Sequence, residues 1–149
     1  MLTENRRETT RIAYRARLHV FLQIPVDASD QRTHELIELG FPAEAVWGFC
    51  DVANLKPRER NQIVTLKTLK TRVERGQRLT AHESDRLYRF AHITAMAEAF
   101  FGDADKAVRW LTKPKERFSG KSPLSMLTST VGTRQVEEML FQLAEGFSF

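Results

Sequence analysis

The segment Thr80-Ala81-His82-Glu83 marks the start of the clearest helix signal in this chain. It has the form of a capping box, in which the threonine oxygen accepts the N–H of Glu83 while the glutamate side chain reaches back to the threonine N–H. Apolar residues then follow at spacings of three or four, namely Leu87, Phe90, Ile93, Ala97 and Phe101. This spacing predicts a long helix with one buried face, ended by Gly102.

The chain on either side of this helix also has helical patterns, and no stretch makes a convincing strand. The helices expected before residue 80 cover about 5–22, 30–39 (capped by Ser29 or Asp30 and stopped by Gly40), Pro42 through Cys50, a short one from Pro57, and about 66–75. After Gly102 we expect a helix capped by Asp103 and closed by Pro114, one that begins at Ser122-Pro123, and a last one that stops at Gly146. The predicted fold class is all-α.

The composition is that of a soluble globular protein. Of 149 residues, 42% are hydrophobic and 28% are charged. No run of roughly 18 apolar residues offers a membrane span. Residues 1–17 lack the apolar core of a secretory signal, and the single Cys50 cannot form an internal disulfide, so a reducing cytoplasm is the expected location. The length fits one domain, or two small helical units that share a core.

No pattern of side chains points to catalysis or to a metal site. The four histidines, at positions 19, 34, 82 and 92, are not spaced as pairs of metal ligands, and there is only one cysteine. The carboxylates stand among lysines and arginines at surface spacings. We therefore predict a protein that is not an enzyme, with no catalytic residues, no metal and no cofactor.

Positive charge is concentrated in the middle of the chain. Between positions 56 and 78 there are eight basic residues, opposed only by Glu59 and Glu74. Such a concentration favours contacts with phosphates, as in nucleic-acid binding. At this point the alternative is a helix face that is simply solvated.

The same region has a helix-turn-helix pattern: a short helix from Pro57, a tight corner, and a basic helix from about Leu66. Thr65 would cap the second helix, and Leu69 would face the core. Threonine and lysine near a helix N-terminus suit contacts with phosphates and base edges. The candidate DNA-binding residues are Thr65, Lys67, Thr68, Lys70, Thr71, Arg72 and Arg75.

In the carboxy-terminal half, glycines, prolines and aromatic residues recur in a fixed order at the joints between the expected helices. They include Phe101-Gly102, Trp110-Leu111, Pro114, Phe118, Gly120, Ser122-Pro123-Leu124, Gly132, Val136, Leu140 and Gly146, preceded by Thr68-Leu69-Lys70-Thr71-Arg72, Gly76 and Arg78-Leu79-Thr80. This order, over roughly residues 35–146, resembles the antitoxins of the Xre/MbcA/ParS type. The chain departs from the family in having Phe118-Ser119-Gly120 for Leu-Gly-Gly and Ser122 for threonine.

The resemblance implies an Xre-like helix-turn-helix DNA-binding unit followed by a small helical toxin-binding unit. Residues 1–24 would form an amino-terminal arm, 25–92 the helix-turn-helix and dimerisation region, and 93–149 the toxin-binding domain. The implied partners are a RES-domain toxin, whose NAD-degrading active site the antitoxin covers, and operator DNA, through which it represses its own operon. A homodimer and a higher-order toxin–antitoxin complex are implied as well.

Within the toxin-binding unit, we expect an ordered apolar tail to enter the toxin's active site and exclude its substrate. Phe147 could instead pack back on the last helix. The candidate toxin-binding residues are Trp110, Lys121, Ser122, Gly146, Phe147, Ser148 and Phe149. Two other interpretations stay open here: a stand-alone DNA-binding regulator of this fold without a toxin, and a helical adaptor that binds only protein.

Overall fold

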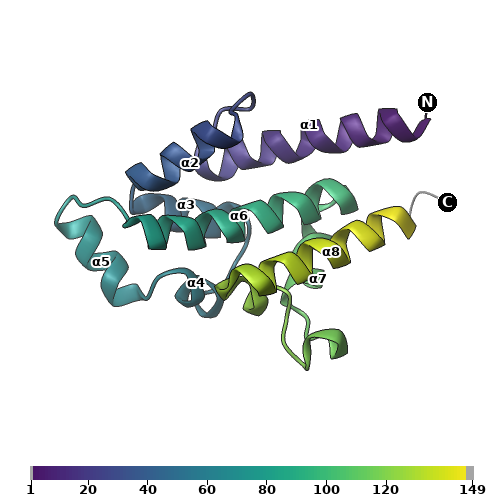
Figure 1. Cartoon of the computed structure of the whole chain (residues 1–149). Coiled ribbons are helices and arrows are strands. Elements are labelled where there is room, and N and C mark those ends of the chain that lie inside the picture. Colours follow the sequence, from purple (N-terminus) through teal and green to yellow (C-terminus); the bar gives the residue numbers. More distant parts are fainter. Residues whose placement is uncertain (1, 147–149) are drawn as a thin grey trace.

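The computed structural model describes residues 2–146, and this part of the chain is helical with no β-strand, which confirms the predicted all-α fold (Figure 1). The α-helices are α1 (Leu2–Leu22), α2 (Asp30–Leu39), α3 (Glu44–Val52), α4 (Pro57–Ile63), α5 (Leu66–Glu74), α6 (Ala81–Phe101), α7 (Ala104–Thr112) and α8 (Thr130–Gly146). Two short 3-10 helices, η1 (Glu116–Phe118) and η2 (Leu124–Thr128), lie between α7 and α8. None of the helices described is long and apolar enough to cross a membrane.

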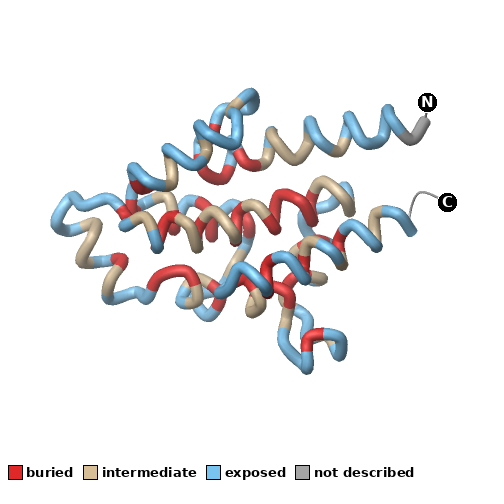
Figure 2. The backbone as a smooth tube through the Cα atoms, in the orientation of Figure 1, coloured by how far each residue is buried: buried red, intermediate tan, exposed pale blue. Residues whose placement is uncertain are grey.

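Helix α6 runs through the middle of the molecule, with α1 along one side and α7 and α8 on the other (Figure 1). Its predicted apolar stripe is buried, since Leu87, Phe90 and Ile93 are fully enclosed, and Figure 2 shows buried stretches along the helix. The capping box is confirmed: Glu83 N–H donates to Thr80 Oγ1 at 3.1 Å, and Thr80 N–H donates to Glu83 Oε1 at 2.9 Å. The element predicted most clearly from sequence is therefore the centre of the fold.

The junction between α6 and α7 also follows the prediction. Gly102 ends α6 in the left-handed region, with φ 68°, where a glycine is favoured. The Asp103 carboxylate then accepts two N–H groups of the first turn of α7. These two residues reverse the chain, so that α7 packs back against α6.

The predicted start of the third helix is wrong. Pro42 forms an isolated bridge with Arg78, and α3 begins only after it. The cause is a close approach of two distant segments, in which Leu79 N–H donates to the Phe41 carbonyl at 2.9 Å. A Cβ at Gly40, whose φ is 92°, would lie 2.2 Å from the Leu79 oxygen, so this approach requires glycine.

The helix predicted at Ser122-Pro123 is the 3-10 helix η2 rather than an α-helix. Ser122 caps it as predicted, because its hydroxyl accepts Ser125 N–H at 3.2 Å. The Ser129 hydroxyl accepts Gly132 N–H at 2.9 Å and starts α8. Because the caps Ser122 and Ser129 are only seven positions apart, the helix between them is short.

Buried side chains from α1 to α8 form one hydrophobic cluster, so the described residues share a single core. Helix α1 joins this core through its second half, where Leu18 and Phe21 are buried and Arg17 pairs with Glu98 of α6 at 2.8 Å. Its first half extends past the end of α6 (Figure 1). The expected boundary between the helix-turn-helix region and the toxin-binding domain, at residues 92 and 93, lies inside helix α6.

Candidate functional site

The candidate DNA-binding residues lie on α5 or directly beside its two ends. Helix α4 precedes α5, and the two helices meet at a corner of two residues, Val64 and Thr65. Val64 is extended, and the Thr65 hydroxyl caps α5 by accepting Thr68 N–H at 3.3 Å. Leu69 is the residue of α5 that is fully buried. The predicted cap and the predicted core residue are both confirmed, and α5 lies at one end of the molecule (Figure 1).

Three of the candidate cations are available for a ligand. Lys67, Lys70 and Arg75 are exposed and make no ion pair with any residue of the described range. Lys67 and Lys70 are three residues apart and therefore share a face of the helix. Thr68 and Thr71 are half-buried beside them. The structure thus places most of the candidate residues on one solvated side of α5.

Arg72 differs from these cations because its guanidinium is used inside the molecule. Its Nε and Nη2 donate to the two carboxylate oxygens of Glu83 at 3.0 and 3.1 Å, and its Nη1 donates to Gln77 Oε1 at 3.2 Å. Burial opposes the charge of Glu83, but the hydrogen bonds from Arg72 and Thr80 outweigh it and hold the pKa of Glu83 below its usual value. The sequence analysis includes Arg72 among the candidate DNA-binding residues, whereas in the structure its guanidinium joins α5 to α6.

The candidate toxin-binding residues within the described range lie on α7, in the loop after it, and at the last position of α8. Trp110 is half-buried, with its ring 6.0 Å from that of Phe101 and the Lys115 ammonium 5.1 Å above its face. Lys121 is exposed and its backbone pairs with that of Lys115. Ser122 is half-buried and serves as the cap of η2. These three side chains border one loop.

Gly146 is exposed at the last described position of α8. Phe147, Ser148 and Phe149, the apolar tail of our prediction, lie outside the described residues. The structure therefore places four of the seven candidate toxin-binding residues, and of those only Gly146 lies at the end of α8.

Sequence reasoning missed an exposed aromatic side chain on α8. Phe141 is 53% exposed, and its ring lies 5.7 Å from that of Phe100 in α6. Glu138 and Glu145 are exposed three residues before it and four after it, so all three side chains share one face. The exposure of Phe141 could have been predicted from the helical spacing, because Val136 and Leu140 define the buried stripe and Phe141 lies off it.

A second contact that sequence reasoning missed is centred on His92 of α6. The Tyr14 hydroxyl lies 2.5 Å from His92 Nδ1, and Glu137 Oε2 lies 3.3 Å from His92 Nε2. One imidazole thus joins α1, α6 and α8. Burial raises the pKa of Tyr14 well above its usual value, so the phenol keeps its proton and the cluster is a structural contact.

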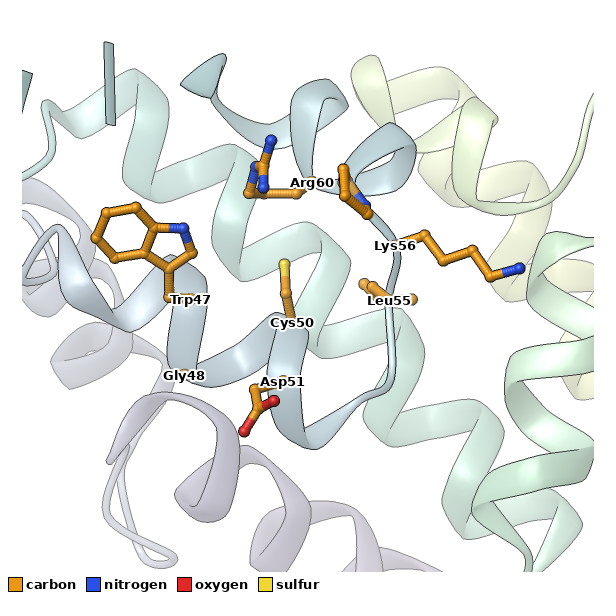
Figure 3. Close-up of a pocket in the computed structure, with 8 residues that line it drawn as sticks. Trp47, Gly48, Cys50, Asp51, Leu55, Lys56 and Arg60 are labelled. Carbon is orange, nitrogen blue, oxygen red and sulfur yellow. The ribbon is translucent and has the colours of Figure 1, made fainter. Parts of the chain in front are cut away.

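A shallow cavity of about 470 Å³ lies between α3 and α4 (Figure 3). Trp47, Cys50 and Arg60 line it, and the Cys50 sulfur points toward Arg60. Burial raises the pKa of the Cys50 thiol to about 12, so it stays protonated at neutral pH, and no histidine lines the cavity. Among residues 2–146, no group of three or more His, Cys, Asp or Glu side chains is arranged to hold a metal ion. A thiol that stays protonated is a poor nucleophile, so Cys50 is a buried structural residue here.

Comparison with known proteins assigns the chain to a family. Residues 96–146 match the antitoxin Xre/MbcA/ParS C-terminal toxin-binding domain. An antitoxin Xre of Pseudomonas putida is 56% identical over 147 residues, which cover 99% of this chain and 92% of that protein. This chain belongs to the Xre/MbcA/ParS family of antitoxins.

Two further relatives of this antitoxin are more distant. An antitoxin Xre of Yersinia enterocolitica is 27% identical over 113 residues, covering 74% of this chain and 76% of the relative. An antitoxin Xre of Photorhabdus laumondii is 29% identical over 84 residues, covering 56% and 57%.

Family membership bears on several of the predictions from sequence. It confirms the resemblance itself and identifies the chain as an antitoxin of a toxin–antitoxin system rather than an enzyme. The matched toxin-binding domain implies a toxin as partner. The match includes Trp110, Lys121, Ser122 and Gly146 of the antitoxin, as well as the exposed Phe141, and it ends before the apolar tail.

Proposed function

We propose that this antitoxin neutralises a RES-domain toxin in the cytoplasm by covering the active site at which the toxin degrades NAD. We propose further that it represses its own operon by binding operator DNA. The first half depends on one observation above all: the segment that matches a toxin-binding domain, 96–146, carries an exposed aromatic side chain, Phe141, between two carboxylates.

The outer face of α8 has the chemistry of a binding surface. Phe141 supplies apolar area, and its contact with the Phe100 ring limits its freedom, which lowers the entropy lost on binding. Glu138 and Glu145 on the same face favour a partner whose cleft has a basic rim. Covering an active site requires shape and charge only, so the antitoxin needs no reactive group of its own.

We extend this surface to the neighbouring parts of the chain. The next residues in the sequence, Phe147, Ser148 and Phe149, lie outside the described part of the chain, and we include them in the proposal on their sequence alone. The proposed toxin-binding residues are therefore Phe141, Gly146, Phe147, Ser148 and Phe149, with Trp110, Lys121 and Ser122 contributing from the loop side.

Replacing Phe141 with alanine tests the toxin-binding half. An exposed aromatic at the centre of an interface typically contributes about 2 kcal/mol, so Phe141→Ala should bind the toxin roughly thirtyfold more weakly and fail to maintain cellular NAD during toxin expression. The matched control is Val131→Ala, which removes an equally exposed apolar side chain elsewhere on α8 and should protect fully. Full protection by Phe141→Ala would rule out this face.

For the DNA-binding half, the support is the unpaired positive charge on α5. Lys67 and Lys70 are exposed on α5, and Arg75 is exposed directly after it. Helix α5 follows a short helix and a tight corner, which is the arrangement that a helix-turn-helix uses to enter the major groove. We propose a homodimer that reads two half-sites of the operator, assembled with toxin into a higher-order complex.

Salt-dependent binding to DNA upstream of the operon tests this second half. A contact with one phosphate contributes about one unit to the slope of log affinity against log salt. Lys70→Ala should therefore weaken binding and lower that slope by about one, whereas Lys113→Ala, an exposed lysine at the end of α7, should leave it unchanged. An identical slope for Lys70→Ala and wild type would contradict a phosphate contact there.

The match of residues 96–146 to a toxin-binding domain favours this function over the stand-alone regulator. Co-purification of a toxin encoded by the adjacent gene distinguishes the two directly. A stand-alone regulator would bind the DNA and retain no such partner.

A further inference from the structure

We infer that the Arg72–Glu83 ion pair positions α5 for DNA, and that Arg72 does not itself contact the nucleic acid. Arg72 is then a positioning residue, and the contacts fall to its neighbours Lys67 and Lys70. This inference rests on the proposed DNA-binding function and names the contact that orients the binding helix.

Side-chain packing holds α5 at few points. Within the helix only Leu69 is fully buried, and Val73 is half-buried one turn later. The helix lies at the end of the molecule (Figure 1), and the segment that joins it to α6 includes Gly76, with φ 63°. A single buried residue fixes the position of a helix better than its direction, so a further contact is needed to set the angle of α5.

The ion pair has the geometry to set that angle. Two parallel hydrogen bonds, of 3.0 and 3.1 Å, join the guanidinium of Arg72 to the carboxylate of Glu83, and paired bonds of this kind fix direction as well as distance. Glu83 is itself held by Thr80 N–H at 2.9 Å in the capping box of α6. The direction of α5 is thereby tied to the central helix of the fold.

Release of Arg72 to a phosphate would be unfavourable. It would leave the carboxylate of Glu83, which is 9% exposed, without its cation, and a charge left unpaired in a buried position is strongly destabilising. The three hydrogen-bonded nitrogens of Arg72, two on Glu83 and one on Gln77, would also lose their partners. Binding of a phosphate by Lys67 or Lys70 would break no ion pair, because neither lysine pairs with another described residue.

Two substitutions separate positioning from direct contact. Glu83→Gln removes the charge but keeps the capping box, in which glutamine serves as well as glutamate. Arg72→Lys keeps the positive charge that a phosphate contact needs but loses the planar fork that Glu83 binds. Affinity for the upstream DNA would be measured over a range of salt concentrations with the full-length protein, after titration of its active fraction.

We expect both variants to bind about tenfold more weakly, with the salt slope of the wild type, because the number of phosphates contacted is unchanged. Lys70→Ala, in contrast, should lower the slope. The matched charge control is Asp85→Asn, which removes a carboxylate two residues away on α6 that pairs with Arg89 at 2.6 Å and not with α5. It should bind DNA at least as tightly as the wild type.

Retention of full affinity by Arg72→Lys, or tighter binding by Glu83→Gln, would overturn the inference, since both results are those of a direct phosphate contact. Hydrogen exchange of the α5 amides supplies a measurement that needs no DNA. In Glu83→Gln these amides should exchange faster, while those of α6 and α8 stay unchanged. If the wild type binds no operator, the repressor function fails on its own, and unchanged exchange in α5 would then overturn the positioning inference separately.

Discussion

Gly132 determines how closely η2 and α8 approach each other in the toxin-binding segment. A Cβ on this residue would lie 2.0 Å from the carbonyl oxygen of Met126 and 3.1 Å from the Ser129 hydroxyl. Its N–H also donates to that hydroxyl. Because the nearest obstacle is backbone, the two elements can pack at this distance only with a hydrogen atom in place of a side chain.

We therefore expect Gly132→Ala to destabilise the protein by about 1–3 kcal/mol, as overpacking of a core does. The control is Gly48→Ala in α3, where an added Cβ meets no atom within 4 Å. That change should stabilise the protein by about 0.5–1 kcal/mol, since alanine favours the helix and restricts the unfolded chain. Urea denaturation measures both, and equal midpoints for the two variants would contradict this account of Gly132.

At the scale of the element, α5 and α8 are both amphipathic helices. Each has a buried stripe, represented by Leu69 in α5 and by Val136 and Leu140 in α8, and each has a solvated face with the side chains that we assign to binding. They differ in how firmly they are held. Helix α8 packs against α6 and η2, whereas α5 is held by the buried Leu69, the half-buried Val73 and the ion pair of Arg72 with Glu83.

This dependence predicts how the stability of the protein changes with pH. The folded state lowers the pKa of Glu83 below its ordinary value of 4.5, so the ionised carboxylate is favoured by folding. The contribution of the ion pair to the free energy of unfolding is then fully present above that ordinary value and is lost as the pH falls through the lower folded pKa.

The difference in stability between the wild type and Glu83→Gln isolates this effect from other carboxylates. We expect a difference of about 2 kcal/mol at neutral pH, typical of hydrogen bonds to a charged group, that shrinks as the solution is acidified below the ordinary pKa. Denaturation midpoints of both proteins over that range provide the measurement. A difference independent of pH would show that the titration of Glu83 is not coupled to folding.

At the scale of the whole molecule, the two proposed binding surfaces lie far apart. Helix α5 is at one end of the molecule and the carboxyl end of α8 is at the other, with α6 between them (Figure 1). Both surfaces nevertheless share one core through α6. Under the proposed function, this separation would leave the toxin-binding surface open while α5 is on DNA.

The separation predicts that each binding function can be removed alone. Lys70→Ala should weaken DNA binding and leave toxin neutralisation intact, and Phe141→Ala should have the opposite effect. Both substitutions are at solvated positions, so both proteins should unfold near the wild-type midpoint. Measuring operator affinity and NAD protection for each variant checks this, and a loss of both functions in either one would contradict separate surfaces.

The helices could be predicted from sequence where the residues that start and end them act locally. Thr80 with Glu83, Gly102 and Asp103 act within a few residues of chain, and each was found where the pattern indicated. The prediction failed at Pro42, which pairs with Arg78. That contact joins segments far apart in the sequence, and no local preference of proline reveals it.

The sequence by itself determined the helical class, the positions of the caps, the basic character of α5 and the family of the chain, because these depend on composition, short spacings and the order of motifs. Only the tertiary structure decided that Arg72 binds Glu83, that His92 joins three helices, and that Phe141 is exposed beside two carboxylates. The physical reason is that burial and pairing depend on which distant segments the shared core brings together, and a one-dimensional pattern does not contain those distances.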